Sequence, residues 1–435
     1  MSRVPAREVD VAIVGGGIIG CATAWYLQQR GMSVGLYEKG RIAGEQSGKN
    51  SGFVRKQGRD RREMELIIRS LDLWGRIDAE TGEETGFNRN GIVSVASDES
   101  KLDSMRAWLR IAREFGVDSE VISMERMKEI SPTFAGDYAG GLYTRSDARA
   151  EPALAAPAIA RALLKRGADV HENCLVQELL LEGGRTRGVV TERGPVRART
   201  VVVAAGLWTG VFLARYGINV PQVDLRVSVG RTAPFDHRVA LPTNFDKALV
   251  RPRHDGGLTI APGLQGPLDY DAAFRSLRHA PRYIRTLFTS REATRVHVGR
   301  YFLEDRRKVR DYLSGDPERY GAIRVPDVPA NARVLGDASA AARAAFGWDS
   351  APPFVEAWAC RIDITPDGVP VLDRVDARGD LIVATGMSGH GFGISLGVGD
   401  TLAEFIHEGR TAISLEPFRL SRFADRYFAA PQNVL

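Results

Sequence analysis

The sequence predicts an α/β fold in which a Rossmann-type dinucleotide-binding domain is interleaved with a second, α+β domain. The first forty residues carry the main observation, because a strand, a glycine-rich turn, a helix, a second strand and an acidic residue follow one another in that order. Two later apolar segments, 199–208 and 381–386, are typical of further strands of the same sheet. Between these blocks, segments 78–143 and 221–353 carry many turns, charged helices and alternating strands, so the nucleotide domain is expected to consist of discontinuous pieces.

The elements at the N-terminus follow from the residue pattern. Val9–Val14 (VDVAIV) is β-branched and almost continuously apolar, which predicts a buried strand. Small and apolar residues at helical spacing predict a helix over 18–30, and Gly31 is suited to end it. A second strand over Ser33–Tyr37 leads directly to Glu38.

Each residue type in the turn has a physical task. Gly15 allows the tight turn, Gly17 lets the backbone approach a pyrophosphate, and Gly20 lets helix and strand pack closely. The helix that begins at Ile18 offers N–H groups and the positive end of its dipole to phosphates. Glu38 can accept hydrogen bonds from ribose hydroxyls and would repel the 2′-phosphate of NADP. The pattern therefore predicts a bound dinucleotide other than NADP; the alternative is a glycine turn with a structural role alone.

The composition of the 435 residues excludes several classes of protein. The apolar fraction is 44% and the charged fraction 26%, which are ordinary globular values and exclude a disordered or collagen-like chain. The net charge of +5 is spread along the chain, so no nucleic-acid-binding stripe is expected. The densest basic cluster, 306–310, is flanked by acidic residues and is interpreted as a solvated face, with an anion patch as the alternative.

The cysteines and the apolar runs bear on the compartment. Cys21, Cys174 and Cys360 are odd in number and widely spaced, so neither a disulfide framework nor a metal site is expected. The N-terminal segment lacks an apolar signal core, and no apolar run approaches the ~20 residues of a membrane helix. We therefore expect a soluble, cytoplasmic protein without a transmembrane segment.

Three sequence blocks resemble those of a known family. They are the Gly15–Glu38 fingerprint, the VVVAAGLWTG stretch at 201–210, and the run over 358–393, which contains TPDG and SGHGFG. Together they resemble the FAD-dependent D-amino-acid oxidase superfamily, and within it the branch of glycine oxidases, sarcosine oxidases and D-amino-acid dehydrogenases. A lesser match lies at 141–154, whereas about 291–352 matches poorly and is interpreted as an insertion.

The resemblance implies an FAD-binding domain and a substrate domain whose mixed β-sheet covers the isoalloxazine ring. The FAD-binding domain is expected from residues 1–77, 144–220 and 354–435, and the substrate domain from 78–143 and 221–353, with the insertion at 291–352.

The resemblance also implies the chemistry. Such enzymes oxidise a C–N bond of a small amine, imino acid or D-amino acid by hydride transfer to flavin N5, and the imine is then hydrolysed. Electrons pass on to O2, a quinone or a partner protein. Backbone N–H groups from Gly391 to Ile394, at the start of a helix predicted over 394–407, would face the negative charge of the reduced flavin. The alternative is a glycine loop that merely closes the sheet.

The residues expected to contact FAD come from the fingerprint, from the loop after Glu38, and from the two later glycine-rich segments. They are Gly15, Gly17, Ile18, Gly20, Glu38, Lys39, Ser47, Lys49, Asn50, Ser51, Val176, Ala205, Gly206, Trp208, Cys360, Gly389, His390, Gly391, Phe392 and Gly393.

Cys360 carries a separate hypothesis. It lies six residues before Pro366, where sarcosine-oxidase-like relatives have a cysteine that tethers the flavin through its 8-methyl group. The resemblance therefore implies FAD, bound covalently or not, and a thioether at Cys360 is one reading. The alternative is a small buried cysteine that packs like alanine or serine.

Lys49, Arg55 and His390 are the candidate catalytic residues. Lys49 and Arg55 lie in the loop 44–58 and are the cations placed to reach a substrate carboxylate, with solvated loop charges as the alternative. His390 is a candidate general base, although the family motif favours backbone positioning there.

The usual carboxylate-binding arginine of the family is absent or moved. It would stand two residues after the cysteine position, where this chain has Ile362, and Arg361 should point to the opposite face of the strand. Either a residue from elsewhere replaces it, or the substrate is not a simple amino acid. The candidates for replacement are Arg55, Lys49 and Arg251.

A second departure concerns the electron acceptor. Sarcosine-oxidase-like relatives use a lysine in a substrate-domain strand to activate oxygen, and the loosely matching position here is Thr259. This departure favours a dehydrogenase or a slow oxidase. Tyr301 and His254 are further candidates for the wall of the substrate pocket.

Other functions remain open from the sequence. The same fold oxidises C–O bonds of 2-hydroxy acids or polyols in some relatives. Other relatives are flavoprotein subunits of hetero-oligomeric dehydrogenases, and the segment 291–352 would then be an interface, or equally a lid or substrate wall. Modification of tRNA is disfavoured because the net charge is small and spread out. The oligomeric state does not follow from the sequence.

Overall fold

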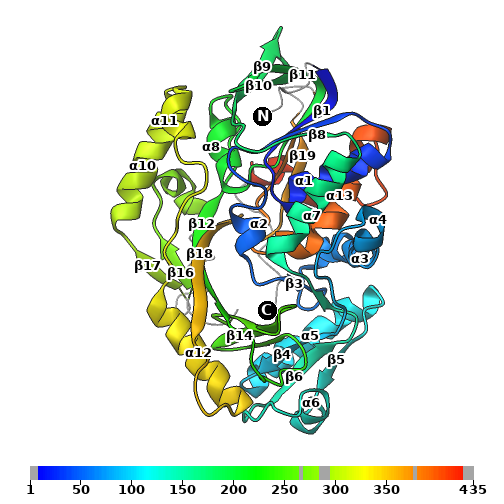
Figure 1. Ribbon diagram of the computed structural model, residues 1–435, viewed down its shortest axis with the longest axis vertical. Helices are drawn as coiled ribbons and strands as arrows, with labels where there is room; N and C mark the ends of the chain where they lie inside the picture. The colour runs from blue at the N-terminus through cyan, green and yellow to red at the C-terminus, as the bar shows by residue number, and fades with distance from the viewer. Residues whose placement is uncertain (1–7, 264–267, 284–293, 376–379, 425–435) are drawn as a thin grey trace.

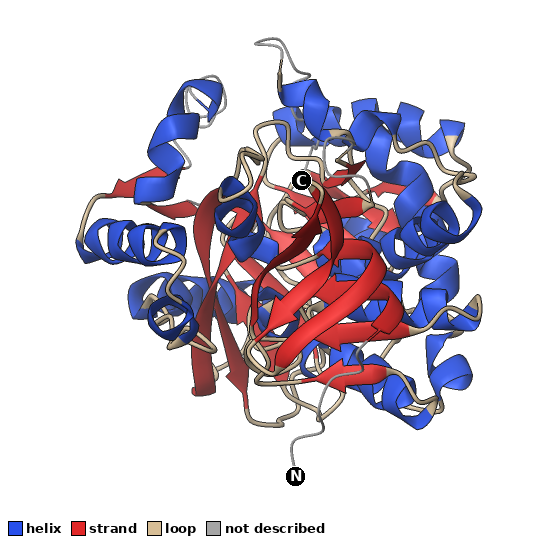
Figure 2. Ribbon diagram, turned by 90° about the horizontal axis from the view of Figure 1, so that it is seen from above, coloured by secondary structure: helices blue, strands red, loops and turns tan. Residues whose placement is uncertain are grey.

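The computed structural model describes residues 8–263, 268–283, 294–375 and 380–424. Two β-sheets lie at the centre of the molecule, and helices surround them (Figures 1 and 2). The strands are β1 (Glu8–Val14), β2 (Val34–Tyr37), β3 (Phe53–Val54), β4 (Ile92–Ala96), β5 (Ser119–Ile122), β6 (Gly140–Thr144), β7 (Ala148–Arg149), β8 (Asp169–His171), β9 (Val176–Glu182), β10 (Arg185–Thr191), β11 (Gly194–Val203), β12 (Val223–Thr232), β13 (Thr243–Phe245), β14 (Ala248–Pro252), β15 (Leu258–Ala261), β16 (Leu268–Asp271), β17 (Thr294–His297), β18 (Phe354–Ile364), β19 (Val371–Arg374) and β20 (Leu381–Thr385). The α-helices are α1 (Ile18–Gln29), α2 (Gln46–Lys49), α3 (Met64–Trp74), α4 (Ile77–Thr81), α5 (Glu99–Glu114), α6 (Met124–Ile130), α7 (Pro152–Lys165), α8 (Thr209–Ala214), α10 (Arg300–Leu313), α11 (Pro317–Gly321), α12 (Ala332–Phe346) and α13 (Gly391–Glu408).

The first sheet has a parallel centre in the order β20-β11-β1-β2-β8. Its middle strand, β1, is buried on both faces: Val11 and Ile13 pack in the core cluster that contains α1 and α13, whereas Ala12 and Val14 pack in the cluster that contains α8. This double burial explains the nearly continuous apolar run in the sequence. The strand–turn–helix–strand order predicted for the first forty residues is confirmed.

Helices α1 and α13 pack against each other at backbone distance. A Cβ on Gly399 of α13 would lie 2.6 Å from the backbone carbon of Ala22 in α1, so only glycine permits this approach. On its other side α13 contacts α3, where Ser70 Oγ and Trp74 Nε1 donate hydrogen bonds to Gly393 O at 2.6 and 3.1 Å. These contacts fix the direction in which the N-terminus of α13 points.

The second sheet is mixed and runs in the order β17-β16-β12-β15-β14-β13-β4-β6-β5, with β18 paired along its length to β12. The expected boundary at residue 354 assigns β18 to the FAD-binding domain, but the strand belongs to the second sheet. The two sheets therefore join after β18, and we propose Ile364 as the end of the substrate domain. The expected domain ends at 1–7 and 425–435 lie outside the described residues.

The segment interpreted as an insertion forms β17, α10, α11 and α12; its first residues, 291–293, lie outside the described part. Helix α12 packs on the second sheet against β12, β14 and β15. Helix α10 contacts both α8 and α11, and α10 and α11 lie on the opposite side of the molecule from α1, α7 and α13 (Figure 1).

Within the described ranges, no helix combines the length and apolar character needed to cross a bilayer.

Candidate active site

The turn after β1 is closed by glycines that contact backbone directly. Gly15 has φ +110°, and a Cβ on it would lie 2.5 Å from the carbonyl oxygen of Ala204, which follows β11. A Cβ on Gly20 would overlap the carbonyl oxygen of Gly15, so α1 packs tightly on the turn. The N-terminus of α1 is thereby fixed at the carboxyl edge of the parallel strands, where sheets of this kind bind their ligands.

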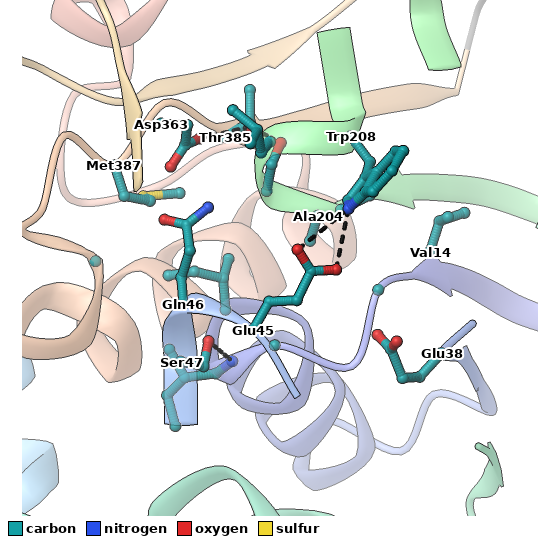
Figure 3. A pocket seen from close by; sticks show the side chains of 18 of the residues that line it. Val14, Glu38, Glu45, Gln46, Ser47, Ala204, Trp208, Asp363, Thr385 and Met387 are labelled. Atoms are coloured by element: carbon teal, nitrogen blue, oxygen red, sulfur yellow. Dashed lines mark hydrogen bonds between the residues drawn. The ribbon is translucent and has the colours of Figure 1, made fainter. Parts of the chain in front are cut away.

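Glu38 follows β2 and lies beside this turn. Its Oε2 accepts a hydrogen bond from Gly16 N at 2.8 Å, and its Oε1 accepts one from Gly40 N at 2.7 Å. Burial raises the pKa of the carboxyl, although the two backbone donors oppose that shift. The carboxylate is thus held in one orientation at the edge of the cavity (Figure 3).

Ser47 places a hydroxyl oxygen at the start of α1. Its Oγ accepts a hydrogen bond from Ile18 N at 2.9 Å, and a Cβ on Gly17 would lie 3.1 Å from the same oxygen (Figure 3). Asn50 Nδ2 holds the short helix α2 in place by donating to Gln46 O at 3.2 Å and Ser47 O at 2.8 Å. An oxygen therefore already lies where the helix N-terminus offers its N–H groups, which is the geometry a phosphate oxygen needs.

One cavity joins these groups to the ends of β11, β18 and β20. The expected FAD contacts that line it are Gly15, Gly17, Ile18, Glu38, Lys39, Ser47, Asn50, Val176, Ala205, Gly206, Trp208, Gly389, Gly391 and Phe392. Those placed elsewhere are Gly20, Lys49, Ser51, Cys360, His390 and Gly393.

Glu45 lies in the cavity between Lys39 and Trp208. Its carboxylate accepts hydrogen bonds from Trp208 Nε1 at 3.0 and 3.2 Å (Figure 3) and pairs with Lys39 Nζ at 2.8 Å. Lys39 Nζ also lies 4.1 Å from the centre of the indole ring. These three side chains fix the wall of the cavity on the side of α8.

A buried carboxylate, Asp363, forms the other end of the cavity. Its Oδ2 accepts hydrogen bonds from Gln222 Nε2 at 2.8 Å, Thr385 Oγ1 at 3.1 Å and Gly386 N at 2.6 Å. Asp363 and Thr385 are each 1% exposed. This network connects β18 of the second sheet to β20 of the first. Its members lie far apart in the chain, so no local sequence motif indicates it.

The N-terminus of α13 faces the same cavity. The helix was expected from Ile394, but it begins at Gly391, because packing against α1 and α3 overrides the low helix propensity of its glycines. Ile394 N donates to His390 O at 3.4 Å within the helix. Of the N–H groups expected as donors at 391–394, those of 391–393, in the first turn, therefore remain available.

His390 lies behind the wall of the cavity. Its Nδ1 is 3.0 Å from Glu63 Oε2, and Glu63 is fully buried. Burial lowers the pKa of His390, with Glu63 opposing and Arg59 adding to the shift. A neutral imidazole bonded to Glu63 holds the start of α13, and its ring does not line either cavity near the site.

Lys49 and Cys360 line a second cavity, which shares Glu45, Leu207 and Trp208 with the first. Lys49 Nζ donates to Pro326 O at 3.5 Å, and Cys360 Sγ lies 3.9 Å from Lys49 O. Burial raises the pKa of the Cys360 thiol to about 12, and Lys49 offsets only part of that rise. The thiol is therefore protonated and weakly nucleophilic at neutral pH.

Arg55 is buried behind the cavities. Its guanidinium donates to the Gln57 carbonyl oxygen, and Arg59 Nε donates to Arg55 O at 2.9 Å. Burial, with Arg59 nearby, lowers the pKa of Arg55 to about 9. Arg55 lines neither cavity.

Arg251 belongs to a buried cluster of arginines that share one glutamate. Its guanidinium binds Glu151 through NH1 at 2.7 Å and NH2 at 3.1 Å, donates to Thr259 Oγ1 at 3.0 Å, and reaches Ser51 O through Nε at 2.6 Å. Arg251 is therefore already paired. Arg149 lies on the same cluster, but its nearest carboxylate contact is Glu151 Oε1 at 3.4 Å.

The strand β18 places Ile362 and Arg361 at different cavities. Ile362 lines the first cavity, whereas Arg361 lines the second and is bound to Asp271 at 2.8 Å and Asp224 at 3.3 Å. Tyr301 packs on that guanidinium, with its ring centre 3.2 Å away, and lines the second cavity. His254 is exposed and contributes its backbone N–H to Glu151.

The described residues fit a dinucleotide with a flavin ring. The glycine turn, Glu38 and the start of α1 supply a cradle for ribose and pyrophosphate, and the start of α13 supplies a positive helix end at the far side of the same cavity. Several lining residues were not among those expected from the sequence: Glu45, Gln46, Tyr312, Asp363, Thr385 and Met387. Asp363, Thr385 and Met387 lie within the run over 358–393 that resembles the family, and this run was the available signal.

Burial lowers the pKa of His390 in the folded protein. As the pH falls, the imidazole therefore takes up its proton at a higher pH in the unfolded chain than in the folded one. The free energy of unfolding should therefore fall as pH drops below the unfolded value of about 6.5, by up to about 1.4 kcal/mol per pH unit. His390→Asn should remove this part of the acid sensitivity, measured by urea unfolding between pH 7.5 and 5. His254→Asn, which alters an exposed histidine, should keep the wild-type slope, and an unchanged slope in His390→Asn would refute the assignment.

The chain was compared with known proteins. Residues 10–405 match the family model described as FAD dependent oxidoreductase. Relatives include 4-methylaminobutanoate oxidase (formaldehyde-forming) of Paenarthrobacter nicotinovorans, 26% identical over 96% of this chain and 46% of that protein. They also include human sarcosine dehydrogenase, 31% identical over 51% and 25%, and sarcosine oxidase subunit beta of Arthrobacter sp., 26% identical over 96% and 92%.

The matched region spans about half the length, or less, of the first two of these relatives. Among solved structures, L-amino acid deaminase from Proteus myxofaciens superposes with a TM-score of 0.91 at 23% identity, covering 97% of this chain and 95% of that one. Glycine oxidase from Geobacillus kaustophilus gives 0.76 at 21%, covering 98% and 100%. The family match over most of the chain, together with the shared fold, shows that the protein belongs to the FAD-dependent oxidoreductase family that the sequence resembles.

Proposed function

We propose that the protein oxidises the C–N bond of a small amine, imino acid or amino acid, with FAD bound in the first cavity. The observation that supports this proposal most directly is that the glycine turn after β1 and the N-terminus of α13 line one cavity, together with the end of β18 from the second sheet. FAD supplies the hydride acceptor when it is bound. The related enzymes named above, which act on methylamino acids, sarcosine, glycine and amino acids, support this reaction class.

In this proposal the residues of the chain bind FAD and the substrate and orient them toward each other. Glu38 would hold the ribose hydroxyls, the first turn of α1 with Ser47 would hold the pyrophosphate, and the first-turn N–H groups of α13 would stabilise negative charge on the flavin ring. Lys49 remains a candidate for the substrate side. His390 and Arg55 have positioning roles, because the imidazole of His390 is bound to Glu63 and the guanidinium of Arg55 to the Gln57 carbonyl oxygen. The substrate then reacts as the neutral amine.

We propose Arg149 as the group that binds the substrate carboxylate, in place of the family's usual arginine. Arg149 is 7% exposed, and its Nε has no hydrogen-bond partner among the described residues. Burial, with Arg251 and Arg253 nearby, lowers its pKa, so an added anion would be favourable there. The strand β7 that carries it pairs with β3, and Ala150 N donates a hydrogen bond to Gly52 O at 2.9 Å, so the cluster adjoins the loop after α2.

Arg149→Gln should weaken binding of a carboxylate ligand without a matching effect on its neutral isostere. Anthranilate, the ligand in the related deaminase structure, is a suitable probe, followed by the change in flavin absorbance. We expect its Kd to rise about 10- to 100-fold, which is the loss of one charge-assisted hydrogen bond. Anthranilamide should be affected less than threefold, and Arg149→Lys should lie between. Equal anthranilate affinity in Arg149→Gln and wild type would refute the assignment.

We propose that FAD is held without a covalent bond, because the buried Cys360 thiol is protonated and faces the second cavity. Acid precipitation of the purified protein should leave all the yellow colour in the supernatant. Cys360→Ser should give the same result. Flavin that stays with the wild-type pellet but not with the Cys360→Ser pellet would establish the thioether instead.

The reaction class is tested by anaerobic absorption titration of the purified protein with sarcosine, D- and L-amino acids, proline analogues and 2-hydroxy acids. We expect a nitrogen compound to bleach the flavin band, at a rate that rises with pH through the pKa of the substrate amine, because the neutral amine is the reactive form. Bleaching by a 2-hydroxy acid alone would replace this proposal with C–O oxidation.

The electron acceptor is a separate part of the proposal. Thr259, which stands at the loosely matched lysine position, accepts a hydrogen bond from Arg251 NH2 at 3.0 Å and supplies no cation, and this supports a dehydrogenase over a fast oxidase. The likeness to sarcosine oxidase subunit beta supports a second arrangement, in which the chain passes electrons to a partner subunit. Three free, buried cysteines are consistent with a reducing cytoplasm.

A further inference from the structure

The segment between Arg300 and Pro326, here called the strap, contacts the first cavity. It comprises α10, α11 and the chain up to Pro326, and it falls within the segment 291–352 that was interpreted from the sequence as an insertion. Its outer face is exposed: the relative exposure of Leu303 is 65% and that of Leu313 is 53%. Its inner face carries the contacts that follow.

Tyr312 of α10 lines the first cavity and is 5% exposed. Its ring stacks on Trp208, with centres 6.0 Å apart and planes inclined by 30°, and Tyr320 of α11 stacks on Tyr312 at 4.3 Å and 28°. Tyr320 OH donates to Gln177 O at 3.0 Å. The strap therefore continues the wall made by Trp208, Glu45 and Lys39.

The C-terminal end of the strap presses on the loop after β2. A Cβ on Gly40 would lie 2.7 Å from Val325 Cγ2, and one on Gly44 would lie 2.9 Å from the same atom. Arg324 NH1 donates to Lys39 O at 3.1 Å, and Lys49 Nζ donates to Pro326 O at 3.5 Å. The strap thus bridges the two sides of the cavity, from Trp208 to the loop that carries Lys39 and Gly44.

A buried ion pair holds the first half of α10 in this position. Asp305 is fully buried and accepts hydrogen bonds from Arg275 N at 2.9 Å and from its guanidinium. The guanidinium of Arg275 also donates to Leu207 O at 3.3 Å, next to Trp208. Because a buried pair is costly to break, α10 is fixed relative to the residues that line the cavity.

We propose that the strap is a cofactor-retaining element, in which Tyr312 closes the side of the FAD cavity and links FAD binding to the folding of residues 300–326. The inference rests on the proposed function only in placing FAD in this cavity; it does not depend on which bond is oxidised. It assigns the Tyr312 side of the strap to the cofactor, while other strap residues, Arg300, Tyr301, Glu304, Lys308 and Pro326, line the second cavity.

The test measures FAD affinity rather than activity. Apoprotein is prepared in a Cys360→Ser background, and FAD is titrated by the quenching of its fluorescence. Tyr312→Ala should raise the Kd of FAD about tenfold or more and speed its release, because the stacked ring and its contact area are lost. Tyr312→Phe, which keeps the ring, should stay within about twofold. Leu303→Ala, on the exposed face of the same helix, should leave the Kd unchanged.

A second readout covers the case in which Tyr312→Ala folds poorly. Backbone amide exchange of the chain with native Tyr312 is compared with and without FAD, and peptides from 300–326 should exchange more slowly when FAD is present. An unchanged Kd in a folded Tyr312→Ala variant, or no protection of the strap by FAD, would overturn the inference while leaving the proposed function intact. Failure of the apoprotein with native Tyr312 to bind FAD would overturn the placement of FAD and the strap proposal together.

Discussion

The position of the two sheets relative to each other depends on one buried carboxylate. Asp363, at the end of β18, receives hydrogen bonds from the start of β12, from the end of β20 and from the backbone of Gly386. A buried acceptor of this kind is costly unless each partner stays in place, so the second sheet is fixed over the carboxyl edge of the first. The cavity exists because of this junction: its floor is the glycine turn of one sheet, and its far end is the strand end of the other.

Local patterns predicted the floor of the cavity, and long-range contacts decided the rest. The spacing of Gly15, Gly17 and Gly20 and the acid at Glu38 follow from backbone sterics within one βαβ unit, so the sequence alone located them. The start of α13 at Gly391 was not predictable by propensity, because the helix is stabilised by α1 and α3 rather than by its own residues. The sheet to which β18 belongs depends on its pairing with β12, more than one hundred residues away in the chain.

The charged candidates illustrate the same limit. Sequence reasoning can place a cation on a loop, but it cannot say which carboxylate is already bound to it. Arg251 was a candidate for substrate binding, and Glu151 satisfies it with two hydrogen bonds. Arg149, which no motif singled out, belongs to the same cluster. Its contact with Glu151 is 3.4 Å long, and its Nε has no hydrogen-bond partner among the described residues. What distinguishes the two arginines is the geometry of one shared glutamate.

The strap changes how the site should be regarded as an energetic unit. If its inner face closes the cofactor cavity, then FAD binding and strap ordering are linked equilibria, and each must stabilise the other by the same amount. Such coupling gives a reason for the aromatic stack of Trp208, Tyr312 and Tyr320, whose members come from elements far apart in the chain. Tyr312 and Tyr320 extend the wall of the cavity beyond Trp208. Leu303 and Leu313, on the exposed face of α10, do not line the first cavity, so substitutions there should leave cofactor binding unchanged.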